Sequence, residues 1–280
     1  MLNQLNGGVC YLFTSFNANV HLSYYVIVPK RFGPGPYFVS MKVLLDEDDL
    51  KSEREIIFEL APLDVMPHSI HLFLSQIEEG YWTRGTPAIA LNAGHVLQAC
   101  PHPCLDNVDM GGNEVGYPYE DMKKAGLDVV SFQEYSTSYP HAKYTIGFAG
   151  RPLSGPEFYI NLMDNSIDHG SLEERKFKMG RQYEAWAKEV FGGVDAVDEN
   201  AIEPYPCFGK VIKGFNVVNE IAKGMTRASL PKDDESYNEL DDSILLRPVK
   251  ISSVTIMKDY NPDAKSPEDI GKEEAINDEL

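Results

Sequence analysis

The chain has 280 residues, of which 43% are hydrophobic and 24% are charged, so neither wholesale disorder nor a fibrous repeat is expected. Its 43 acidic and 25 basic residues give a formal net charge of −18. A surface this acidic repels phosphate backbones, so we expect no nucleic-acid partner. No run of 18 uninterrupted apolar residues occurs, so we expect no membrane span in this chain.

Residues 1–36 are expected to form an N-terminal extension that ends in the turn-rich segment 30–36. The middle of this extension is aromatic and β-branched, which predicts an added strand or hairpin. From residue 37 the pattern becomes regular. Segments 37–45 and 55–62 have the composition of strands and are separated by an acidic turn, which predicts an antiparallel pair.

Apolar residues at helical spacing then predict a helix that begins near Pro67 and ends at Gly80. One or two buried strands are predicted within 88–99, and a loop-rich region covers 101–126. Two more strands follow, at 143–150 and 156–164.

The polar stretch 165–200 contains one predicted helix, at 181–191. The remaining predicted elements are a strand at 207–214, a helix at 215–224 and a last strand at 248–257. About eight strands, mostly joined as hairpins, and two or three helices predict a mainly β fold: a closed antiparallel barrel with helices at its ends. Residues 258–280 are acidic, and we expect a disordered tail there.

The order of these elements resembles that of the cyclophilin-type peptidyl-prolyl isomerases. The similarity lies in EIIFELAPLDVMPHSIHLFLSQIEEG, GPEFYINLMDN, PVKISSVTI and, most specifically, CFGKVIKGFNVVNEIAKG. It implies a cyclophilin-like domain over 37–257, with an insertion at about 165–203. The implied fold is a closed eight-stranded antiparallel barrel capped by two helices, with an inserted helix and flexible termini. The implied activity is cis–trans interconversion at X-Pro bonds, without metal or cofactor.

The resemblance also assigns candidate residues to a peptide groove on one outer face. Ala90 stands where the family has its catalytic arginine, and His95 stands where it has a groove phenylalanine. Gln98 matches the family's glutamine, and Gly147 replaces its alanine. Two more groove candidates are aromatic: Tyr159 matches a phenylalanine, and Tyr205 falls at the groove histidine.

The loss of the arginine is the main departure from the family pattern, because alanine has no hydrogen-bond donor. If that donor supplies about 3 kcal/mol of transition-state binding, its removal costs roughly a hundredfold in rate. Arg84, Arg151 and His95 are the residues that could supply a donor instead. We therefore assign no catalytic residue to the candidate groove.

Two features fall outside this assignment. The insertion is either a surface elaboration or a lid or partner-binding appendage that carries Trp186. The segment Cys100–Pro101–His102–Pro103–Cys104 is either a proline-stiffened loop with two thiols or a metal or redox clip. A structural zinc site needs four ligands, and no second pair with ligand spacing is present, so we expect no metal.

Three functions remain open from the sequence. The first is a cyclophilin-like protein that binds a proline-containing peptide or a protein client, with weak or absent isomerase activity. The second is an active isomerase with a donor from a loop, and the third is a metal or redox module at residues 100–104. We expect a monomer. The terminal Asp-Glu-Leu differs at one position from an endoplasmic-reticulum retention signal; otherwise the cytoplasm is expected.

Overall fold

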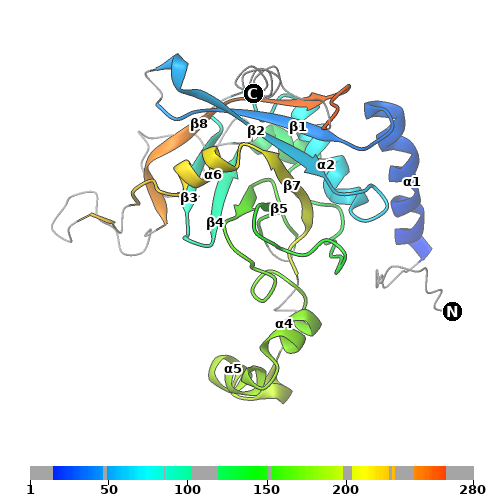
Figure 1. The fold of residues 1–280 in the computed structure, drawn as a ribbon. Coiled ribbons are helices and arrows are strands. Elements are labelled where there is room, and N and C mark those ends of the chain that lie inside the picture. The colour runs from blue at the N-terminus through cyan, green and yellow to red at the C-terminus, as the bar shows by residue number, and fades with distance from the viewer. Residues whose placement is uncertain are drawn as a thin grey trace, which may run out of the picture.

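Eight antiparallel strands close into a barrel in the computed structural model, in the order β1-β2-β7-β5-β6-β4-β3-β8 (Figure 1). The structure describes residues 15–46, 49–84, 86–101, 119–150, 153–197, 204–226, 229–230 and 243–262. The strands are β1 (Phe38–Leu44), β2 (Glu53–Leu60), β3 (Ala88–Asn92), β4 (Val96–Cys100), β5 (Thr145–Phe148), β6 (Phe158–Asn161), β7 (Cys207–Lys213) and β8 (Ile244–Met257). The predicted mainly β barrel is confirmed.

Alternation along the strands divides the barrel into a core face and an outer face, because successive side chains of a strand point to opposite sides. Ile146, Phe148, Phe158 and Ile160 belong to the core cluster and are fully buried. The residues between them, Gly147 and Tyr159, are directly paired across β5 and β6 on the other side of the sheet. This outer face carries the candidate groove.

Helices α2 (Pro67–Glu78) and α6 (Phe215–Ile221) bury one side in the barrel core. In α2 this side includes Ile70, Phe73 and Leu74, and Pro67 occupies the first turn, where its missing N–H is tolerated. The α6 residues in the core are Val217, Val218 and Ile221. These two helices match the predicted caps, although α6 ends three residues earlier than the predicted helix at 215–224.

The N-terminal extension contains a helix rather than the predicted strand or hairpin. Helix α1 (Ser15–Phe32) packs along α2 (Figure 1). Tyr24, Val28 and Phe32 lie on its buried side, four residues apart, and join the core cluster. The ring of Tyr24 lies 4.5 Å from that of His71, and Nη2 of Arg31 lies 3.1 Å from the Glu79 carboxylate. Packing against α2 therefore prevails over the local β propensity.

The insertion holds two helices, α4 (Leu172–Met179) and α5 (Gln182–Phe191), where one was predicted. They project from the barrel as a separate lobe (Figure 1). Leu172, Tyr183 and Ala187 form a small cluster of their own, with Trp186 against it. Helix α4 was missed because its sequence, LEERKFKM, carries too few apolar residues for a helical stripe.

Three further differences between the predicted and the observed elements concern shorter segments of the chain. A short helix, α3 (Tyr119–Lys124), lies in the region predicted to be loop-rich. Strand β8 begins at Ile244, four residues before the predicted strand. Beyond Met257 the ring of Tyr260 lies 4.9 Å from that of Phe38, so the start of the predicted tail packs on the barrel. Residues 263–280 lie outside the described residues, as do residues 1–14.

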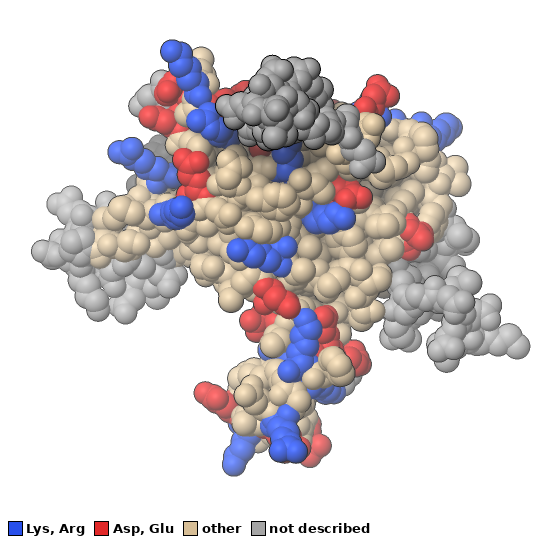
Figure 2. Space-filling view, viewed as in Figure 1, with Lys and Arg blue, Asp and Glu red and all other residues tan. Residues whose placement is uncertain are grey.

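Charged side chains of both signs are interspersed on the face shown in Figure 2, over the barrel and over the α4–α5 lobe. The net charge of −18 is therefore not gathered into one patch on that face. Within the described ranges, no helix combines the length and the apolar character needed to cross a membrane.

Candidate functional site

The candidate residues of three strands lie in one row across the outer face of the barrel. Gln98 of β4 pairs with Tyr159 of β6, and Tyr159 pairs with Gly147 of β5. Directly opposite residues in antiparallel strands project to the same face, so the three positions are neighbours. The structure thus brings together Gln98, Gly147 and Tyr159, which are up to 61 positions apart in the sequence.

A β-bulge lies at Ala90, where the resemblance predicts the family's arginine position. The β3–β4 register shifts between Ile89 and Leu91, so Ala90 and Leu91 together oppose Gln98. Ala90 is buried, and Leu91 is half-buried. Neither side chain has a hydrogen-bond donor.

Gly147 makes room for the ring that lies beside it. A Cβ at this position would lie 2.8 Å from the main-chain oxygen of Pro206 and would also collide with the Tyr159 side chain. Because the Tyr159 ring occupies this space, only glycine fits at position 147 without a shift of the neighbouring atoms. The site therefore combines a phenol where the family has a phenylalanine with a glycine where it has an alanine.

Tyr159 is covered by side chains from three loops, and only 3% of its surface is exposed. The ring centroid of His169 lies 4.8 Å from that of Tyr159, and the ring of Tyr205 lies 5.9 Å from it. The Tyr159 hydroxyl lies 3.3 Å from Nδ1 of His141, which is fully buried. An outer-face side chain is thus enclosed by the protein itself.

The hydrogen bonds of His141 fix the form of its ring. Nε2 lies 2.9 Å from the main-chain oxygen of Tyr205, and a carbonyl oxygen can only accept, so Nε2 donates. In the neutral ring Nδ1 is then an acceptor, and the Tyr159 hydroxyl donates to it. His141 therefore holds both Tyr159 and Tyr205 in place.

Asn165 ties the covering loops together. Its main-chain N–H donates to the His141 oxygen at 2.9 Å, and its own oxygen accepts from the His169 N–H at 2.8 Å. Its side-chain Nδ2 donates to the main-chain oxygen of His95 at 3.0 Å. The Tyr205 N–H donates to the His169 oxygen at 2.9 Å. The cover over Tyr159 is therefore a hydrogen-bonded unit.

His95 lies at the β3–β4 turn, next to this unit. Its ring centroid is 5.5 Å from that of His169, and its Nδ1 lies 3.0 Å from the Ala93 oxygen. Nδ1 therefore donates to this oxygen, which holds the His95 ring at the turn.

The arginine candidates are placed elsewhere or lie outside the described residues. The side chain of Arg84 folds over Gly80, where its Nε would lie 3.1 Å from an added Cβ. Arg151 lies outside the described residues. Arg175 of α4 was not considered from the sequence. Its guanidinium carbon lies 4.6 Å from the Trp186 ring centroid, and its Nη2 donates to the main-chain oxygen of Asp168 at 3.2 Å.

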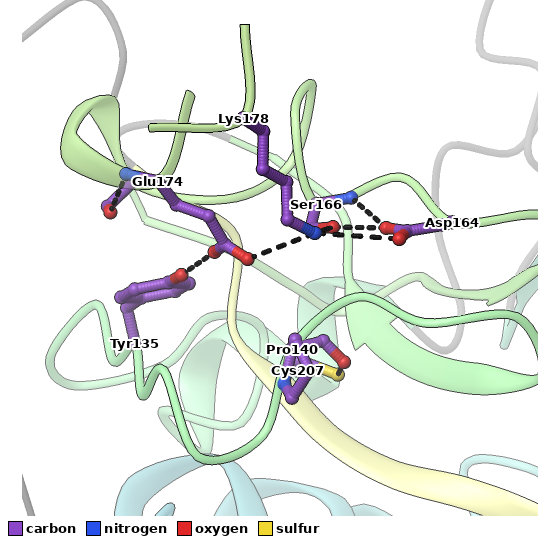
Figure 3. Close-up of polar contacts among 8 residues, drawn as sticks. Tyr135, Pro140, Asp164, Ser166, Glu174, Lys178 and Cys207 are labelled. Atoms are coloured by element: carbon purple, nitrogen blue, oxygen red, sulfur yellow. Dashed lines mark hydrogen bonds and ion pairs between the residues drawn. The ribbon is translucent and has the colours of Figure 1, made fainter. Parts of the chain in front are cut away.

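A polar network fastens the α4–α5 lobe to the loops beside the site (Figure 3). Glu174 of α4 accepts a hydrogen bond from the Tyr135 hydroxyl and lies 3.4 Å from Nζ of Lys178. Lys178 also contacts Ser166 and lies 3.5 Å from the Asp164 carboxylate. Hydrogen bonds from Ser166 hold the pKa of Asp164 below its usual range. The lobe is thus anchored through residues that flank His169.

The carboxyl group of Glu134 is fully buried. Glu134 accepts hydrogen bonds from the main-chain N–H groups of His68 and Ser69, both at 2.8 Å, and from the Ser69 hydroxyl at 2.7 Å. It thereby caps the N-terminus of α2 from a distant loop. Burial raises the pKa of Glu134 to about 7 despite these donors.

The cysteine segment offers no described metal site. Cys100 is disulfide-bonded, whereas His102 and Cys104 lie outside the described residues. No group of three or more potential metal-binding side chains occurs among the described residues. Cys207 is a free, buried thiol whose pKa is raised to about 12 by burial.

His141, Asn165 and His169 were not predicted from the sequence. His141 and His169 lie in loops that the family resemblance did not align, and Asn165 is the last residue of the aligned segment GPEFYINLMDN, where no motif marked it. The one available signal was composition, because the chain contains only 7 histidines and two of these fall in the loops beside β5 and β6.

Comparison with known proteins identifies one protein family. Residues 48–256 match the family model described as cyclophilin type peptidyl-prolyl cis-trans isomerase/CLD. A Cryptosporidium parvum cyclophilin type peptidyl-prolyl cis-trans isomerase has 15% sequence identity and a TM-score of 0.45, with 80% of this chain and 100% of that chain covered. A structure of that protein in the presence of the dipeptide Ala-Pro has 14% sequence identity and a TM-score of 0.44. The match covers 79% of this chain and 99% of that chain.

No curated protein matches the chain in sequence. The family model alone spans well over half of the chain, and the closed eight-stranded barrel has the predicted cyclophilin-like architecture. The chain therefore belongs to the family of cyclophilin-type peptidyl-prolyl cis-trans isomerases and cyclophilin-like domains.

Proposed function

We propose that this protein binds a proline-containing peptide or protein partner and has weak or absent peptidyl-prolyl isomerase activity. The observation that carries the proposal is the pairing of Gln98 with the bulge residues Ala90 and Leu91, neither of which has a donor. From the family resemblance, the catalytic guanidinium is expected at Ala90.

The missing donor matters because of the chemistry of the X-Pro bond. Amide resonance sets a rotation barrier of about 18–20 kcal/mol. A catalyst lowers it by binding the twisted amide better than the planar one, and a donor to the proline nitrogen favours the twisted form. Removal of about 3 kcal/mol of such binding slows the reaction roughly a hundredfold.

The enclosure of Tyr159 supports the low isomerase activity in this proposal. At 3% exposure its ring offers little surface to a proline, and His141, His169 and Tyr205 occupy the space in front of it. A substrate would have to displace part of a hydrogen-bonded unit before it could pack on this ring.

An isomerisation assay with an X-Pro tetrapeptide tests the proposal. We expect the wild-type rate to lie near the uncatalysed rate. Ala90→Arg and Leu91→Arg each place a guanidinium opposite Gln98, and the better of the two is expected to gain at least tenfold when combined with Tyr159→Phe. Met163→Arg, at an exposed position, controls for added charge. A wild-type rate typical of active isomerases would show that another group donates to the proline nitrogen, and this would contradict the proposal.

A further inference from the structure

A cavity of about 640 Å³ lies between the end of α1 and the end of β2. Its walls come from the end of α1 and the segment after it, from the end of β2 and the turn that follows, and from Ser138, Tyr139 and Lys210. A volume of this size is within the range of sites that bind small ligands or short peptide segments. All residues that form its walls belong to the described part of the chain.

The walls are apolar and offer few hydrogen bonds. Four prolines and two tyrosines line the cavity: Pro29, Pro34, Pro36, Pro62, Tyr37 and Tyr139. Proline has no N–H, so these four residues add no main-chain donors. The N–H groups of Leu60, Ala61 and Val65 already donate within the protein, at 2.9, 2.8 and 2.9 Å. Such a site disfavours phosphates, sugars and other ligands that need many donors.

The polar groups of the wall include one ion pair and the hydroxyl of Tyr139, which is buried without a hydrogen-bond partner among the described residues. Nζ of Lys210 lies 2.8 Å from the Glu59 carboxylate, and the two side chains are 48% and 33% exposed. Together they offer a donor and an acceptor without net charge. An uncharged peptide unit has one donor and one acceptor, so its polarity complements this pair.

One loop contributes residues both to the cavity and to the cover of the outer-face site. Ser138 and Tyr139 line the cavity, and His141, two residues later, holds the Tyr159 hydroxyl. Aromatic and proline-lined surfaces of this kind suit extended segments that place aliphatic or proline side chains against them.

We propose that this cavity binds an extended, uncharged peptide segment of a partner protein, with a branched aliphatic side chain buried between Leu63, Tyr37 and Tyr139. The main chain of the segment exchanges hydrogen bonds with Glu59 and Lys210. This site is separate from Gln98, Gly147 and Tyr159, so the proposal does not depend on isomerase activity.

Fluorescence polarisation of a labelled hexapeptide, Ala-Pro-Leu-Pro-Val-Ala, tests the proposal with the full chain. Its prolines keep the peptide extended, which reduces the entropy lost on binding. We expect saturable binding with a Kd below about 1 mM and at least a tenfold loss for the peptide Ala-Pro-Ser-Pro-Ser-Ala. Leu63→Gln is expected to weaken binding at least tenfold, while Met163→Gln, the same kind of change at an exposed residue, leaves it unchanged.

Amide chemical shifts of the ¹⁵N-labelled chain then locate the peptide. Shifts at Leu60, Ala61 and Leu63 that persist in the Ala90→Arg variant support the proposal, whereas shifts confined to Gln98 and Tyr159 overturn it and favour the groove. Should Leu63→Gln fail to fold, Pro34→Ser at an exposed wall position replaces it with the same expectation. Binding of the small apolar probe N-phenyl-1-naphthylamine without any binding of the peptide would assign the cavity to a small molecule and contradict the peptide.

Discussion

A Cβ atom at Gly147 would lie 2.6 Å from the hydroxyl oxygen of Tyr159. This distance is shorter than any contact a real Cβ makes with oxygen, so the two residues constrain each other. The glycine leaves room for the phenol beside it, and the phenol hydroxyl lies 3.3 Å from Nδ1 of His141. The space that each of the two residues occupies therefore depends on the other.

Gly147→Ala is therefore expected to destabilise the protein by about 1–3 kcal/mol, the usual cost of overpacking. Urea unfolding of the variant measures this loss. Tyr159→Phe removes the hydroxyl but not the ring, so the double variant should recover part of the loss, with a coupling energy of about 1 kcal/mol. Strictly additive effects of the two changes would show that the residues do not interact.

Glu134 predicts a pH dependence of stability with a defined sign. Its pKa rises from an ordinary 4.5 to about 7 on folding, so the folded state holds this proton more tightly than the unfolded state. The stability from this group is fully present below pH 4.5 and is lost as the pH rises through about 7. The total loss is on the order of 3 kcal/mol.

Glu134→Gln tests this dependence because the amide does not titrate. Urea unfolding is measured for both proteins at pH 5, 6 and 7. In the difference between their free energies of unfolding, the contributions of the carboxyl groups that they share cancel. The free energy of unfolding of the wild type should fall relative to that of the variant as the pH rises. A constant difference across this range would mean that Glu134 is already ionised when buried.

Glu174 is expected to hold the α4–α5 lobe on the barrel, since it accepts from Tyr135 and lies 3.4 Å from Lys178. Glu174→Gln removes the charge and should increase trypsin cleavage within residues 172–191 about tenfold. Thermal unfolding of the barrel should change by only a few degrees, because the lobe has its own small core. Glu173→Gln, at an exposed neighbour, serves as the control.

Cys207 is expected to resist thiol reagents. Burial raises its pKa to about 12, and the thiolate is the reactive form. After exposure of the native protein to iodoacetamide at pH 8, mass spectrometry should find the peptide with Cys207 unmodified. The same peptide should be labelled completely in denaturant, and rapid labelling of the native protein would indicate that β7 opens locally.

The sequence allowed the barrel to be predicted because its strands alternate and its FGKVIKGFNVVNEI segment is distinctive. The same resemblance placed Gln98, Gly147 and Tyr159, which the structure arranges in one row. The cover of His141, Asn165 and His169 could not be predicted, since loop residues meet only after the barrel closes. Helix α1 carried a usable signal in Tyr24, Val28 and Phe32, but local β propensity obscured it.

The family match and the barrel do not begin at the same residue. The match covers 48–256, whereas β1 (Phe38–Leu44) pairs with β2 on one side and with β8 on the other. A fragment trimmed to the match would lose the strand that joins these two, leaving each with an unpaired edge. Such edges recruit other chains, so the shortened protein should aggregate where the full barrel does not.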